Sequence, residues 1–219
     1  MRAPRLLPTL ALLPFALVTG CTGQQPAVEP APKASATPPS SSPSSGPSVS
    51  APAATAVLPD GPLRELVPAP GEVPAGLEPV VAGSGPRDVG EVAAFSADPS
   101  AASRALSQHG FRAAYVAQYA SRTDLRSLTV VAVRFADADG ARADLDGDVA
   151  ATGGTAVDAP TIGDASDVRR LELPDDEAAE LLTVRFRKGP TTWLVAWRAT
   201  RPADADVPLE IARALADRG

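Results

Sequence analysis

The stretch ELLTVRFRKGPTTWLVAWRAT, residues 180–200, decides the fold class of this 219-residue chain. Apolar and polar side chains alternate on both sides of Gly189 and Pro190, which is typical of two antiparallel strands joined by a turn. Because successive side chains of a strand point to opposite faces, the large apolar residues are expected to share one face. These residues are Leu182, Val184, Phe186, Trp193, Val195 and Trp197. The hairpin therefore predicts an antiparallel sheet.

Helices are expected on both sides of this hairpin in the sequence. In the first, within residues 96–111, Asp98 is a good N-cap, Pro99 lies in the first turn and Gly110 supplies the left-handed stop. Asp206 is expected to cap the last helix in the same way. The expected helices lie within 96–111, 137–151 and 206–219, and the further strands at 111–120, 125–136 and 166–173.

Residues 59–219 are therefore expected to form a single α+β domain, with a largely antiparallel sheet of about five strands and three helices packed on it. The segment 60–86 is crowded with proline and glycine, which indicates a loop with a short extended piece near 77–81.

The first 20 residues have the pattern of a secretory signal peptide. A basic head, MRAPR, precedes the apolar run LLPTLALLPFALV, and the small residues Thr19 and Gly20 stand just before Cys21. Cys21 is the only cysteine of the chain, so it cannot form an intramolecular disulfide.

The tetrapeptide Val18-Thr19-Gly20-Cys21 resembles the bacterial lipobox, which most often has leucine where this chain has Val18. In lipobox proteins the cysteine thiol receives a diacylglyceryl group, and the signal peptide is cut just before it. The resemblance implies that acyl chains on Cys21 anchor the protein to the extracytoplasmic side of the cell membrane, because two or more chains suffice for stable anchoring. The alternative is an ordinary secreted protein whose cleavage site adjoins a cysteine.

Residues 21–58 are expected to form a tether. The segment is rich in proline, serine and alanine and has almost no large apolar side chain, so it cannot bury enough surface to offset its chain entropy. Its reach as a coil is roughly 35 Å, enough to hold a domain away from the membrane.

Four stretches are similar to small lipoprotein domains of actinobacteria: HGFRAAYVAQY (109–119), VAVRFADADGARADL (131–145), APTIGDAS (159–166) and VRFRKGPTTWLVAW (184–197). Some of these lipoproteins, the LpqN type, have a PsbP/Mog1-like α/β sandwich and bind partners or ligands without catalysis. The resemblance implies a domain of this kind.

Composition argues against several other functions. One cysteine and one histidine, His109, do not supply the usual metal-ligand sets. The acidic stretch 137–150 fails as a calcium loop, because Arg142 or Val149 stands where the turn needs glycine. Neither a metal nor a cofactor is expected. The net charge of −6 also argues against nucleic acid as a partner.

The first functional hypothesis is a non-catalytic module that binds an envelope protein, a lipid or a small molecule. It predicts an apolar groove or exposed aromatic patch on the sheet, since tryptophan dominates binding hot spots. The candidate surface comprises Trp193, Trp197, Tyr115, Tyr119 and Asp164. One alternative is an envelope hydrolase or transferase that uses carboxylates such as Asp164, Asp175 or Asp176 facing each other across a cleft. A third hypothesis is an accessory sensor domain of another envelope protein.

Overall fold

Strands β7 (Ala179–Lys188) and β8 (Thr191–Thr200) form the expected hairpin and pair along their whole length. The computed structural model describes residues 57–173, 176 and 178–219. In the register of the hairpin, Val184 pairs with Val195 and Phe186 with Trp193, and all four side chains belong to one buried cluster. The alternation in the sequence therefore predicted the buried face correctly. The leader, Cys21 and the tether up to residue 56 lie outside the described residues.

The sheet has eight strands among the described residues, in the order β1-β3-β4-β8-β7-β6-β5, with β2 also paired to β3. The pairs of named strands are all antiparallel. The expected number of about five was too low, because β1, β2 and β5 have only two or three residues and depend on pairing with longer strands. The remaining bounds are β1 Leu77–Pro79, β2 Gly85–Arg87, β3 Phe111–Ser121, β4 Ser127–Phe135, β5 Thr155–Ala156 and β6 Ala165–Glu172.

The part of the chain that the structure describes contains four α-helices, one more than expected. The additional helix is α1, and it starts with a capping box in which Asp88 and Glu91 each accept a hydrogen bond from the other's backbone N–H. Helix α2 begins after Asp98 and is followed by Gly110 at φ +80°, as the sequence predicted. The bounds are α1 Val89–Ala93, α2 Pro99–Gln108, α3 Ala138–Ala151 and α4 Asp206–Ala216.

The N-terminus of α4 differs from the expectation. Asp206 is the first helical residue, and the cap position is held by Ala205, which makes no side-chain cap. A carboxylate oxygen of Asp204 instead accepts a hydrogen bond from the backbone N–H of Asp206, at 2.9 Å. The acidic residue that satisfies this end of the helix therefore stands two positions earlier in the sequence.

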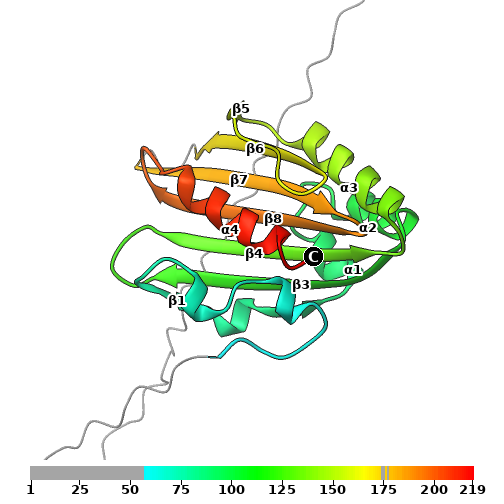
Figure 1. The fold of residues 1–219 in the computed structure, drawn as a ribbon, viewed down its shortest axis with the longest axis horizontal. Coiled ribbons are helices and arrows are strands. Elements are labelled where there is room, and N and C mark those ends of the chain that lie inside the picture. Colours follow the sequence, from blue (N-terminus) through cyan, green and yellow to red (C-terminus); the bar gives the residue numbers. More distant parts are fainter. Residues whose placement is uncertain (1–56, 174–175, 177) are drawn as a thin grey trace, which may run out of the picture. The chain divides into compact units, whose positions relative to one another are not determined.

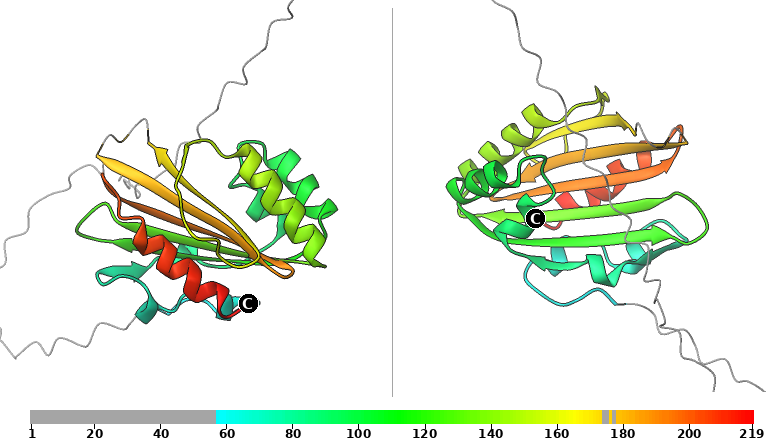
Figure 2. Two further views of the ribbon diagram at one scale, coloured as in Figure 1. Left: turned by 45° about the horizontal axis from the view of Figure 1, so that its top comes forward. Right: turned by 180° about the vertical axis from the view of Figure 1, so that it is seen from behind.

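Helices cover both faces of the sheet. Helix α4 lies on one face, and α1, α2 and α3 lie near one end of the opposite face (Figure 1, Figure 2). Helix α3 passes very close to the end of α2, because a Cβ added to Gly140 would lie 2.0 Å from the carbonyl oxygen of His109. Two hydrophobic clusters result, one on each face of the sheet.

Residues 58–74, here named the strap, cross the same face of the sheet as α4 (cyan in Figure 1). The strap contains two short 3-10 turns, Arg64–Leu66 and Pro70–Glu72. Its buried side chains are Leu58, Leu63, Leu66 and Val67, of which Leu58 was expected to belong to the tether and is only 2% exposed. The strap is thus a part of the hydrophobic core, although its sequence indicated a loop.

Candidate functional site

The four aromatic residues of the candidate surface lie on one face of the sheet but do not form an exposed patch. Tyr115, Tyr119, Trp193 and Trp197 are between 0 and 3% exposed, and all four belong to the cluster beneath the strap and α4. The sequence predicted their common face and could not indicate what covers it. Of the two surfaces that the binding hypothesis allows, an apolar groove or an exposed aromatic patch, these four residues do not form the exposed patch.

Three of these side chains hold the strap through its backbone. The hydroxyl of Tyr115 donates to the carbonyl oxygen of Pro59 and that of Tyr119 to the carbonyl of Pro68, both at 2.5 Å. The indole Nε1–H of Trp193 donates to the carbonyl oxygen of Leu66 at 3.0 Å. Burial raises the pKa of Tyr119 to about 12, so its hydroxyl keeps the donated proton at neutral pH.

The fourth aromatic residue, Trp197, lies at an opening in this cover. A cavity of about 360 Å³ separates the end of the strap from the start of α4, above the last residues of β8. The indole Nε1–H of Trp197 is buried and has no acceptor among the described residues. The residues that line the cavity are Pro74, Asp124, Arg126, Trp197, Ala199, Thr200, Pro202, Asp204 and Val207.

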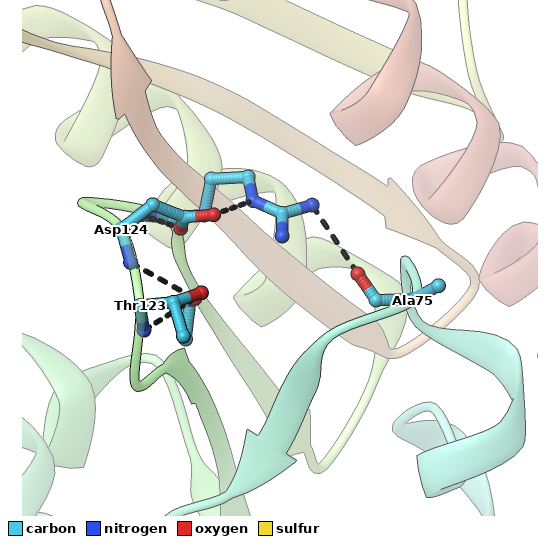
Figure 3. A network of polar contacts seen from close by, with 5 residues as sticks. Ala75, Thr123 and Asp124 are labelled. Carbon is cyan, nitrogen blue, oxygen red and sulfur yellow. Dashed lines mark hydrogen bonds and ion pairs between the residues drawn. The ribbon is translucent and has the colours of Figure 1, made fainter.

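One side of the cavity is built by the turn between β3 and β4. The guanidinium of Arg126 donates to Asp124 at 2.9 Å through Nε and to the carbonyl of Ala75 at 3.2 Å through Nη1. Figure 3 shows that this network joins the turn at Asp124 to the residue after the strap. The backbone N–H of Arg126, together with side-chain donors from Ser121 and Arg126, holds the pKa of Asp124 below its usual range. The negative charge of Asp124 is therefore balanced by the guanidinium of Arg126.

The other side is built by the loop that follows β8. Glu180, only 6% exposed, accepts a hydrogen bond from Arg170 at 2.5 Å and another from the backbone N–H of Ala203 at 2.9 Å. This buried carboxylate fixes the loop between two cavity residues, Pro202 and Asp204. Asp204 itself is exposed and forms an ion pair with no described cation.

Asp164 is not part of this cavity. Its carboxylate accepts hydrogen bonds from Arg187 and from the backbone N–H of Gly189, both at 2.9 Å, and so stabilises the turn between β7 and β8. Asp176 forms an ion pair with Arg198 at the opposite end of β7. Arg187, the partner of Asp164, is six positions along β7 from Leu181, which lies opposite Arg198, and this spacing corresponds to roughly 20 Å.

Asp164 and Asp176, two of the carboxylates named for a hydrolase or transferase, therefore do not face each other across a cleft. Asp175 lies outside the described residues. The carboxylates that do line the cavity, Asp124 and Asp204, were not singled out from the sequence. No local signal distinguished them from other acidic residues in polar turns.

One carboxylate of the acidic helix α3 contacts the sheet. Asp144 accepts a hydrogen bond from the hydroxyl of Thr192 on β8 at 3.0 Å, and it is turned toward the sheet. Burial, reinforced by the nearby charge of Asp148, raises the pKa of Asp144 to about 7. Asp148 is more than half exposed and lies 3.8 Å from Arg185. Within the described part of the chain, no group of three metal-ligating residues comes together.

These features define a class of mixed α/β domain, with one antiparallel sheet between a strap and a single helix on one face and three helices on the other. The same fold is found in the extracellular domain of PknH from Mycobacterium tuberculosis, with a TM-score of 0.52 and 13% sequence identity. The match covers 75% of this chain and 98% of that domain. No family model and no curated protein matches the sequence.

Across residues 57–173, 176 and 178–219, every helix is too short or too polar to cross a membrane.

Proposed function

We propose that this chain is an actinobacterial-type envelope lipoprotein, anchored through Cys21, whose folded part binds a partner protein or ligand outside the cytoplasm without catalysis. The cavity above Trp197 carries the binding part of the proposal, because it opens a sheet face that the strap and α4 otherwise cover. The leader and the lipobox-like tetrapeptide support the anchor. The fold shared with an extracellular domain supports the location.

The anchor is tested by labelling and fractionation. Wild-type chain and Cys21→Ala are produced in a bacterium that acylates lipobox proteins and is fed an alkyne fatty acid. We expect the wild type to carry the label and stay with the membrane, and the variant to be unlabelled and released, because the Cys21 sulfur is where the diacylglyceryl group is attached. A variant that stays with the membrane contradicts the anchor.

The binding role is tested by filling the cavity. Val207, at the start of α4, lines the cavity, and Val207→Trp places an indole there. Ala214→Trp adds the same side chain to an exposed position of the same helix and serves as the control. Molecules crosslinked to each chain in intact cells are identified by mass spectrometry. The proposal requires a molecule that is captured by the wild type and Ala214→Trp and lost with Val207→Trp.

A second candidate is an accessory domain that works with another envelope protein. The fold shared with the extracellular domain of PknH favours this candidate, because that domain is one domain of PknH and not the whole protein. The crosslinking experiment separates the two. An accessory domain that docks through a surface away from the cavity captures one protein, and Val207→Trp does not affect that capture.

A further inference from the structure

We propose that the cavity above Trp197 binds an extended, proline-containing peptide that carries a lysine or arginine, with a peptide carbonyl accepting the hydrogen bond of the Trp197 indole. This inference rests on the proposed binding function and names the chemical class of its partner.

The interactions of the strap supply the precedent. On this face of the sheet, Tyr115, Tyr119 and Trp193 each donate a hydrogen bond to a backbone carbonyl of a proline-rich segment. Two of the three accepting carbonyls belong to prolines, Pro59 and Pro68. Aromatic grooves recognise proline-rich peptides in this way, because such peptides are already extended and leave their carbonyls free.

Trp197 is the fourth aromatic residue of the same face and lacks such an acceptor. Its side chain is 3% exposed and lines the cavity, and its buried Nε1–H has no acceptor among the described residues. A buried donor without a protein partner is unfavourable, so an incoming carbonyl that reaches it gains a hydrogen bond. Because Nε1 exposes less than 1 Å², docking includes a small movement of the indole toward the cavity.

The walls and charges of the cavity define the rest of the peptide. Pro74, Pro202 and Val207 provide apolar walls for proline rings. Asp124 is neutralised by Arg126, whereas Asp204 pairs with no described cation, so the cavity has an excess negative charge. A basic side chain next to the proline complements Asp204.

The test follows the two indole Nε1–H signals in a ¹H–¹⁵N spectrum of the secreted Cys21→Ser chain. The chain has only two tryptophans, so Trp193→Phe assigns both signals. The probe is acetyl-Ala-Pro-Pro-Lys-Pro-Ala-amide, and the control peptides replace lysine by glutamate or every proline by alanine. We expect the Trp197 signal to shift in a saturable way and the Trp193 signal to stay, because its hydrogen bond to Leu66 is already formed.

Asp204→Asn is expected to weaken binding of the lysine peptide about two- to fivefold, the range for an exposed ion pair. Asp217→Asn, at the C-terminal end of α4 and away from the cavity, is the control and should leave the affinity unchanged. The proposal is overturned if about 10 mM peptide leaves the Trp197 signal in place, if both indoles shift equally, or if the lysine and glutamate peptides bind alike. If the peptide does not shift the Trp197 signal while Val207→Trp still abolishes crosslinking of a molecule in cells, the peptide class is wrong and the binding role stands.

Discussion

Trp193 and Leu66 are 127 residues apart in the sequence, yet the indole of the first donates a hydrogen bond to the carbonyl of the second at 3.0 Å. We call this contact between the strap and β8 the seam. Arg218 extends it, because its guanidinium donates to the carbonyl of Val67 at 3.2 Å and pairs with Glu72 at 2.8 Å. The aromatic face of the sheet is therefore closed by both ends of the described domain.

Tyr119→Phe is expected to lower the free energy of unfolding by about 1–3 kcal/mol, because it leaves the buried carbonyl of Pro68 without a donor. Urea denaturation followed by tryptophan fluorescence measures the change. Tyr115→Phe is the comparison and should have a smaller effect, since its hydrogen bond to Pro59 is only partly buried. Equal stability of Tyr119→Phe and wild type would show that the strap is not held by this bond.

Two glycines of helix α3 are expected to respond in opposite ways to alanine. Gly140→Ala forces a Cβ against the carbonyl oxygen of His109 and should destabilise the fold by about 1–3 kcal/mol. Gly147→Ala meets nothing within 4 Å, so the better helix propensity of alanine should stabilise it by up to about 1 kcal/mol. Thermal unfolding of both variants measures the effect, and a Gly140→Ala variant as stable as wild type would contradict the close packing of α3 on α2.

Asp144 is expected to make stability depend on pH. Its pKa of about 7 in the folded protein exceeds the value near 4 of an unfolded chain, so the folded state holds a proton that the unfolded state releases. Stability should therefore fall as the pH rises from about 4 to about 7. Asp144→Asn should melt higher than wild type at pH 8 and at nearly the same temperature at pH 3, below the unfolded pKa. Asp146→Asn, on the exposed side of α3, should show no such difference.

Glu180→Gln is expected to lower stability by about 2 kcal/mol, because it removes the charge that receives the hydrogen bond of Arg170 in a buried position. The loop at Ala203 should also exchange its amide hydrogens faster, since its backbone N–H donates to the same oxygen. Hydrogen exchange by mass spectrometry measures this. Glu210→Gln, on the exposed face of α4, is the control. Unchanged exchange at Ala203 would argue against Glu180 as the support of the cavity wall.

Most of the sheet and its helices could be predicted because their sequences carry periodic signals. The alternation around Gly189 and the capping by Asp98 and Gly110 gave the correct elements. The capping box of Asp88 and Glu91 was an equally readable signal for α1 that the proline and glycine around it obscured.

The strap and the cavity could not be predicted, because neither depends on local pattern. The strap is held by carbonyl groups, which every residue has, and its proline-rich sequence resembles that of any loop. Asp124 and Asp204 meet at one end of the sheet because Ser127 pairs with Arg198, which brings the β3–β4 turn beside the loop after β8. That proximity follows from the strand order, which the sequence does not state.

The seam between Leu66 and Trp193 also sets the order in which the domain can be completed during synthesis. A ribosome adds roughly 5–20 residues per second, so the 127 residues between the two partners take roughly 6–25 s to make. During that interval the nascent strap lacks the indole of Trp193 and the cover of α4, because β8 and α4 have not yet been made. Hairpins such as β3–β4 can form early from local contacts, whereas this face closes only after β8 and Arg218 have been made.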